Sequence, residues 1–165
     1  MYRDILYPTD GSTGSEAAAE HVQDLASSFG ATVHVLHVVD TPHGGLGRSG
    51  GFVSDEFSSM SGRSAETGYE GMEMSDVDDA LMEEAEAVVE EWAAALGDVE
   101  TVTEVEAGSP YSEILRYADE HDVDAIVMGT HGRTGIERYL LGSVTEKVVR
   151  MADRPVLTIR GNESG

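Results

Sequence analysis

One stretch of the chain reads DAIVMGTHGRTGIERYLLGSVTEKVV, at residues 124–149. Its first five residues are nearly all apolar, which is typical of a buried strand. A glycine-rich connection follows, and a helical pattern then begins at Ser143, with Val144, Val148 and Val149 predicted to point inward. The stretch therefore predicts a strand, a glycine loop and a helix in succession.

The same alternation continues outward from this stretch in both directions. Further strands are predicted at residues 5–7, 31–39, 101–107 and 155–160. Helices are predicted at residues 13–29, 76–96 and 143–152, and from Pro110 with an apolar face that extends to Ala118. The helix at 76–96 is predicted to present one apolar face, formed by Val77, Leu81, Val88, Trp92 and Leu96. Strands that alternate with helices form a parallel sheet joined by right-handed crossovers. We therefore predict an α/β fold, a doubly wound five-stranded parallel sheet with helices on both faces.

The length of 165 residues fits one domain, 1–165, and the chain has no cysteine for disulfides or thiolate chemistry. Residues 41–75 contain eight glycines and no sustained period. We interpret this segment as a long flexible loop, which is unusual enough at this length to suggest a function or disorder.

The chain is strongly acidic, with 32 acidic and 10 basic residues and a net charge of −22. Such a surface repels nucleic acids and anionic lipids, so neither is an expected partner. Lys147 is the only lysine. We interpret this composition as adaptation to molar salt, where screening relieves self-repulsion; a simple solubility role is the alternative. No signal peptide or membrane span is recognised, and the expected location is the cytoplasm.

Ligands of doubly wound sheets bind beyond the carboxyl ends of the strands. There, Gly129 and Gly132 directly follow a strand, and Gly142 with Ser143 opens a helix after nine intervening residues. Glycines allow close backbone approach, and a helix N-terminus offers free N–H groups to a phosphate. The alternative is an ordinary capping box, in which Ser143 and Glu146 cap the helix and no ligand binds.

Other motifs in the chain are less convincing. GLGRSG at residues 45–50 matches a dinucleotide fingerprint, and Ser49 matches a nucleophile elbow, but neither has the strand–turn–helix context. His34 and His37 should point to opposite faces of one strand, which argues against a metal pair. We predict no catalytic residue and no protein-held metal.

The chain resembles the universal stress protein family over nearly its whole length. The resemblance rests on ILYPTDGS at 5–12, HVV at 37–39, GSP at 108–110 and the segment 128–149, which matches the ATP-binding motif G-x2-G-x9-G-[ST]. It implies the sheet order 3-2-1-4-5 and a homodimer through the last strand, from Pro155 to Arg160. The implied ATP-binding residues are Pro8, Thr9, Asp10 and Val38 at the adenine and ribose, Met128 and Gly129 at the ribose, and Gly132, Gly142, Ser143, Val144 and Thr145 at the phosphates.

Two residues near this motif have alternative roles. Asp10 either orients the adenosine or helps to hold magnesium, or it is a turn residue after the strand. Arg133 either lends charge to the phosphates or points to solvent. Because no lysine lies near the loop, a bound triphosphate is expected to bring Mg²⁺.

Three functions are compatible with these observations. The first is an ATP-binding stress or signalling module without fast catalysis, and this one is favoured because no general base or arginine finger can be assigned. The second is a slow ATP hydrolase or phosphotransferase. The third is an oligomeric scaffold with no bound nucleotide.

Overall fold

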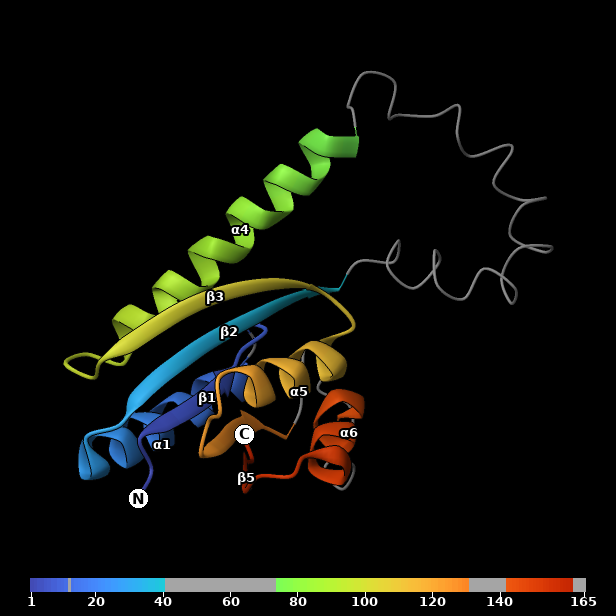
Figure 1. Ribbon diagram of the computed structural model, residues 1–165. Coiled ribbons are helices and arrows are strands. Elements are labelled where there is room, and N and C mark those ends of the chain that lie inside the picture. The colour runs from blue at the N-terminus through green and yellow to red at the C-terminus, as the bar shows by residue number, and fades with distance from the viewer. Residues whose placement is uncertain (12, 41–73, 131–141, 162–165) are drawn as a thin grey trace.

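The computed structural model describes residues 1–11, 13–40, 74–130 and 142–161. Within these ranges strands and helices alternate, as Figure 1 shows. The elements are β1 (Asp4–Pro8), α1 (Thr13–Phe29), β2 (Thr32–Asp40), α4 (Met74–Ala95), β3 (Thr101–Gly108), α5 (Pro110–Glu120), β4 (Ala125–Gly129), α6 (Ser143–Met151) and β5 (Val156–Ile159). The strands form one parallel sheet in the order β3-β2-β1-β4-β5. The predicted fold and strand order are therefore confirmed.

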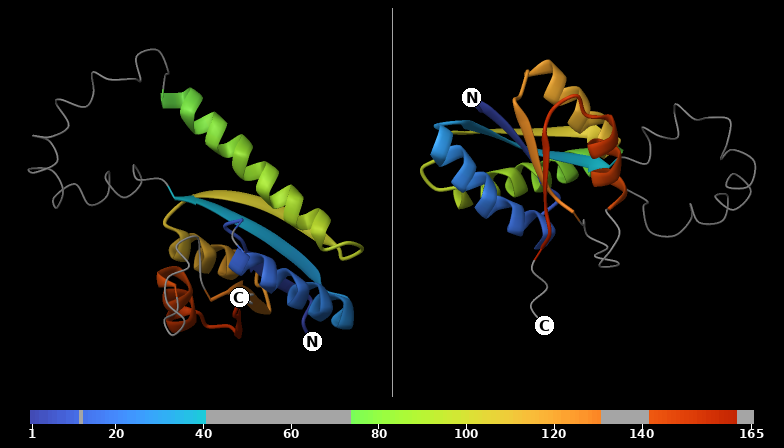
Figure 2. Two further views of the ribbon diagram at one scale, coloured as in Figure 1. Left: turned by 180° about the vertical axis from the view of Figure 1, so that it is seen from behind. Right: turned by 90° about the horizontal axis from the view of Figure 1, so that it is seen from below.

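Two layers of helices cover the sheet. α1 and α4 pack on one face and α5 and α6 on the other, so the pairs lie on opposite sides of the strands (Figure 2). Alternation along β1 separates the two cores: Ile5 and Tyr7 face α1 and α4, whereas Leu6 faces α5 and α6. Both cores are built from apolar side chains that are almost fully buried.

The predicted boundaries differ from the structure at two helices. α4 begins at Met74, two residues before the predicted start, and α6 ends at Met151. Residues 41–73 of the predicted loop, which include the motif at 45–50, lie outside the described residues. None of the described helices is both long and apolar enough to cross a membrane.

Two apolar side chains predicted to face the core are exposed instead. Leu81 is 42% exposed and Val149 is 44% exposed. On α4 the buried positions are Ala85, Val89 and Leu96. The first turns of α4 extend past the sheet (Figure 1), so the periodic pattern continues where no sheet lies beneath it.

Polar groups at the amino ends of the strands form hydrogen bonds with one another. The Asp124 carboxylate accepts the N–H groups of Arg3 and Asp4 at 2.7 and 3.1 Å, and these bonds lower its pKa. His34 lies between the Asp4 carboxylate at 3.0 Å and the Tyr117 hydroxyl at 2.9 Å. Burial, helped by nearby acidic side chains, raises the pKa of Tyr117 to about 12. The polar groups of this cluster are therefore paired with one another and with nearby backbone.

The carboxyl ends open into a crevice between β1 and β4. These two strands pair only at Ile5 with Ala125 and Leu6 with Ile126. Beyond these pairs β1 continues along β2 as far as Pro8, while β4 continues along β5 as far as Gly129. The strand order reverses at this point, which is where open α/β sheets bind ligands.

Candidate nucleotide-binding site

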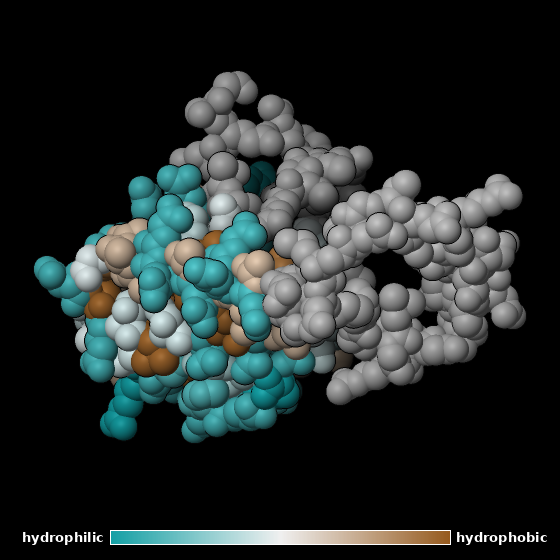
Figure 3. Space-filling view, turned by 90° about the horizontal axis from the view of Figure 1, so that it is seen from above, coloured by the Kyte–Doolittle hydropathy of each residue, from teal (hydrophilic) through white to brown (hydrophobic). Residues whose placement is uncertain are grey.

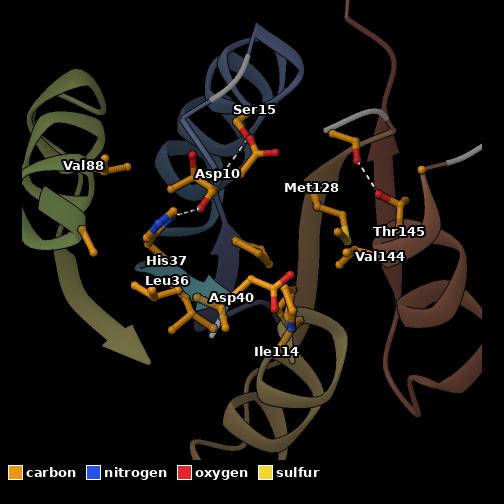
Figure 4. Close-up of a pocket in the computed structure, with 18 of the residues that line it drawn as sticks. Asp10, Ser15, Leu36, His37, Asp40, Val88, Ile114, Met128, Val144 and Thr145 are labelled. Atoms are coloured by element: carbon orange, nitrogen blue, oxygen red, sulfur yellow. Dashed lines mark hydrogen bonds between the residues drawn. The ribbon is translucent and has the colours of Figure 1, made fainter. Parts of the chain in front are cut away.

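A cavity of about 580 Å³ lies at this crevice. Its walls come from the loop after β1, the ends of β2 and β4, the first turn of α6, and one side each of α4 and α5 (Figure 4). Cavities of this size are typical of small-molecule sites. The position predicted from the strand ends therefore coincides with a real hollow in the molecule.

The structure brings ten of the twelve predicted site residues together on this cavity. They are Pro8, Thr9, Asp10, Val38, Met128, Gly129, Gly142, Ser143, Val144 and Thr145. The other two, Gly132 and Arg133, lie outside the described residues. The two segments of the motif are therefore adjacent in space, although residues 131–141 separate them in sequence.

The start of α6 turns backbone donors toward the cavity. The Gly142 N–H donates to the Thr130 carbonyl at 2.7 Å, and the Glu146 N–H donates to the Gly142 carbonyl at 2.9 Å. The N–H groups of Ser143, Val144 and Thr145 lie in the first turn, so they have no hydrogen-bond acceptor within the helix. Such a group of N–H donors at the positive end of a helix dipole suits a phosphate.

The alternative capping box does not form. Gly142 rather than Ser143 occupies the N-cap position, and no side chain among the described residues caps the helix. The Glu146 carboxylate instead accepts a hydrogen bond from Arg150 at 2.6 Å. Ser143 is exposed on the first helical turn, so its hydroxyl is not needed as a cap.

The Thr145 side chain has a positioning role. Its hydroxyl donates to the Gly129 carbonyl at 2.9 Å, and the residue is only 4% exposed. This bond joins the start of α6 to the end of β4 (Figure 4). Because the hydroxyl proton is committed to Gly129, the backbone N–H is the donor that Thr145 can offer a phosphate.

The structure shows why position 129 requires glycine, a reason that the sequence did not reveal. A Cβ at this position would lie 2.5 Å from the carbonyl oxygen of Gly14, in the first turn of α1. A separation this short is not tolerated between non-bonded heavy atoms. The missing Cβ of Gly129 thus allows the backbone of α1 at Gly14 to pack against the end of β4. Close helix packing, as well as any approach to a ribose, requires Gly129.

The loop after β1 is held in place by its own polar groups. The Asp10 carboxylate accepts a hydrogen bond from the Ser15 hydroxyl at 2.9 Å. The Ser15 hydroxyl oxygen in turn accepts one from the Asp10 N–H at 3.3 Å. The Thr9 hydroxyl accepts the Gly11 N–H at 3.2 Å, and Gly11 has a φ of +76°, which favours glycine. Asp10 therefore supports the loop and lines the cavity, so its two alternative roles are compatible.

His37 fixes the same loop from the neighbouring strand. Its Nδ1 lies 2.7 Å from the Thr9 carbonyl oxygen, and a carbonyl can only accept, so Nδ1 carries the proton. The ring is 9% exposed and lines the cavity. Figure 4 shows it beside Asp10, opposite Val88 of α4. His37 is a positioning residue of the cavity wall that our sequence analysis missed.

The other missed residues come mainly from the side of α4 and the end of β2. The wall also includes Ser15, Leu36, Val39, Asp40, Leu81, Glu84, Ala85, Val88, Pro110 and Ile114. Leu81 and Val88 belong to the predicted apolar stripe of α4, so the pattern identified them as core. No signal in the sequence distinguishes an apolar side chain that packs in the core from one that lines a cavity.

The carboxylates are the charged side chains of the described part of the cavity wall. Asp10, Asp40 and Glu84 line it, and no lysine or arginine does so among the described residues. The described residues also contain no group of three or more metal-ligating side chains that could hold an ion. Hydrophilic side chains cover much of the face in Figure 3, with apolar patches between them.

Comparison with known proteins agrees with this architecture. The family model described as the universal stress protein family matches residues 1–160. The chain is 37% identical over 161 residues to universal stress protein MJ0531 of Methanocaldococcus jannaschii, covering 97% of this chain and 83% of that protein.

Two solved structures share the fold. That of MJ0577 from Methanocaldococcus jannaschii superposes with a TM-score of 0.73, at 32% identity and with 99% of each chain covered. That of a universal stress protein from Archaeoglobus fulgidus in complex with dAMP has a TM-score of 0.58 at 21% identity, covering 96% of this chain and 98% of that one. The matched length, the identity to MJ0531 and the common strand order lead to one conclusion: this chain belongs to the universal stress protein family.

Proposed function

We propose that the protein binds an adenine nucleotide, with ATP favoured, in the cavity between β1 and β4. The observation that carries this proposal is the convergence of three elements on one hollow. The loop after β1, the end of β4 and the first turn of α6 all line it. The free N–H groups of α6 offer a place for phosphates, and Val38, Met128 and Ile114 offer apolar contacts for a base.

The same fold is able to hold an adenine nucleotide elsewhere in nature. The structure from Archaeoglobus fulgidus described above is a complex with dAMP. That finding concerns the other protein, and it supports the proposal only through the shared fold.

A thermal-shift titration tests the ligand. ATP with Mg²⁺ should raise the Tm, because a ligand that binds only the folded state adds about 2.7 kcal/mol at one hundred times its Kd. GTP should raise it less if the cavity distinguishes the base. An unchanged melting curve at millimolar ATP would remove the proposal.

Two variants test the place. Gly142→Asp puts a negative charge at the start of α6, where it should repel a phosphate and abolish ATP binding, while circular dichroism stays native. Ser143→Ala is the milder partner and should weaken ATP binding with little change in the Tm of the unliganded protein. Equal ATP affinity in wild type and Gly142→Asp would place the phosphates elsewhere.

We propose further that Mg²⁺ arrives with the triphosphate and that no fast chemistry follows. Magnesium commonly keeps several waters and binds one or two carboxylates together with phosphates, and Asp10 and Asp40 line the cavity. A phosphate-release assay on the purified protein distinguishes a binding module from a slow ATP hydrolase. Mass spectrometry of the denatured supernatant distinguishes both from a scaffold without nucleotide.

We also propose a cytoplasmic protein adapted to high salt. The net charge of −22 produces self-repulsion that salt screens. The protein should unfold or aggregate on dialysis into low-salt buffer and recover in molar KCl. Full stability at low salt would leave the charge as a solubility device.

The proposed assembly is a homodimer through the last strand. β5 pairs with β4 on one side and lies at the edge of the sheet, and Leu157 on it is 44% exposed. An exposed apolar edge strand is a ready surface for pairing. Light scattering after size exclusion should give twice the mass of one chain. The Leu157→Lys variant should give the mass of a single chain. A monomeric wild type would exclude the dimer.

A further inference from the structure

The cavity that we propose for an anionic ligand has acidic side chains on its wall. Asp40 and Glu84 are exposed carboxylates on that wall, one at the end of β2 and one on α4. The Asp10 carboxylate joins them, although it is bonded to Ser15 and shapes the loop. The α6 N-terminus opposes these charges with about half an elementary charge. Within the described wall, the carboxylates thus outnumber the positive groups that could offset the charge of a polyphosphate.

Several basic side chains of the described chain are already paired elsewhere. Arg116 contacts Glu106, Glu113 and Glu120 at 3.1, 2.6 and 2.8 Å. Arg154 contacts Asp119 and Asp122, both at 3.2 Å. Arg150 pairs with Glu146, and the Lys147 ammonium lies 4.6 Å from the centre of the Tyr111 ring. These four cations contact acidic or aromatic side chains elsewhere, and none of them lines the cavity.

We infer that Asp40 and Glu84 determine which charge state of an adenine ligand the cavity accepts. This inference rests on the proposed function. At low ionic strength the site binds adenosine or AMP in preference to free ATP, and added salt raises its affinity for ATP. In a site where lysine and arginine hold the phosphates, added salt lowers the affinity for ATP, because salt there screens an attraction. The salt effect inferred here has the opposite sign.

The size of the effect follows from Coulomb's law. At an assumed separation of about 8 Å in water, and with screening at 0.1 M salt, one carboxylate weakens the binding of a ligand with four negative charges about fivefold. The same carboxylate weakens a doubly charged ligand about twofold. At 1 M salt the Debye length is about 3 Å, and the effect on the four-charge ligand falls to roughly 1.3-fold.

Calorimetric titration with three ligands tests the inference. Adenosine, AMP and magnesium-free ATP are titrated at 1 M KCl and at the lowest KCl concentration at which circular dichroism remains native. We expect the ATP affinity to rise at least about fivefold with salt, the AMP affinity to rise less, and the adenosine affinity to stay constant. Adenosine is the internal control, since salt that merely stabilised the fold would raise all three affinities together.

Matched variants identify the residues. Glu84→Gln and Asp40→Asn should each raise the low-salt ATP affinity about fivefold and leave the 1 M value nearly unchanged. Glu86→Gln is the control, because Glu86 is an exposed glutamate of the same helix that does not line the cavity. It changes the net charge equally and should alter ATP affinity less than about twofold.

The outcomes separate the two claims. ATP affinity that falls with salt, or equal effects of Glu84→Gln and Glu86→Gln, overturns the charge selection while leaving nucleotide binding in place. Failure of adenosine, AMP and ATP to bind at every salt concentration overturns the proposed function, and this inference with it.

Discussion

The two ends of the sheet use polar side chains for different purposes. At the amino end, polar side chains bond to one another or to nearby backbone; they belong to Asp124, His34, Asp4 and Tyr117. At the carboxyl end, polar bonds hold the walls of a cavity while the first N–H groups of α6 face into it. A buried polar network is thus not by itself a sign of a site. The distinguishing feature is the set of donors that the fold leaves without an internal acceptor.

The largest expected effect comes from Gly129→Ala at the carboxyl end. The added Cβ would lie 2.5 Å from the Gly14 carbonyl oxygen, so α1 and β4 must move apart. We expect a loss of about 3 kcal/mol in the free energy of unfolding, measured by urea denaturation. Gly30→Ala, at the other end, meets no atom within 4 Å and should cost only about 1 kcal/mol through its φ of +64°. Equal losses would mean that the close approach to Gly14 is unimportant.

The two buried histidines of β2 provide the next comparison. His34→Leu leaves the Asp4 carboxylate and the Tyr117 hydroxyl without their shared partner and should cost about 2 kcal/mol of stability. His37→Leu releases the Thr9 carbonyl and should cost about 1 kcal/mol. Only His37→Leu should weaken nucleotide binding, as measured by calorimetry. Weaker binding in His34→Leu would contradict the division between the two ends.

Two variants of Thr145 test whether its hydrogen bond or its side-chain shape supports ATP binding. Thr145→Val keeps the side-chain shape but removes the bond to the Gly129 carbonyl, and it should cost about 1 kcal/mol of stability and reduce ATP affinity. Thr145→Ser keeps the hydroxyl and should retain most of that affinity. Identical ATP affinities for the two variants would exclude the bond to β4 as the cause.

The smallest effect is expected at Asp124, and it depends on pH. Its pKa is lowered in the folded protein, so its contribution to stability is present above the usual range for aspartate. That contribution disappears as pH falls through this range toward the lowered pKa. Asp124→Asn should cost about 1 kcal/mol at pH 7 and lose less stability than wild type between pH 6 and pH 3, measured by Tm. A parallel acid dependence in both proteins would assign the acid sensitivity to other carboxylates.

Much of the fold could be predicted because its signals are local. Apolar runs, helical spacing and the stops at Gly30 and Gly97 identify the elements, and both of these glycines have the positive φ expected of a helix end. The parallel arrangement then follows from alternation alone. The resemblance to a known family supplied the strand order.

The parts that could not be predicted depend on contacts between distant segments. Leu81 and Val149 continue apolar patterns but are 42% and 44% exposed, and Leu81 lines the cavity instead of the core. The close approach of Gly129 to Gly14 and the bond from His37 to Thr9 arise only when β1, β2 and β4 lie side by side. Glycine spacing marked where the site lies, but it could not show which bonds hold its walls.

The contact between Gly14 and Gly129 has a consequence for folding kinetics. It joins segments from opposite ends of the chain, and the cavity also draws its walls from both ends. Contacts of such high sequence separation carry a large loop-closure entropy and form after local structure. A ligand held in this cavity would then stabilise the native state far more than the folding transition state. It should slow unfolding and leave the folding rate almost unchanged.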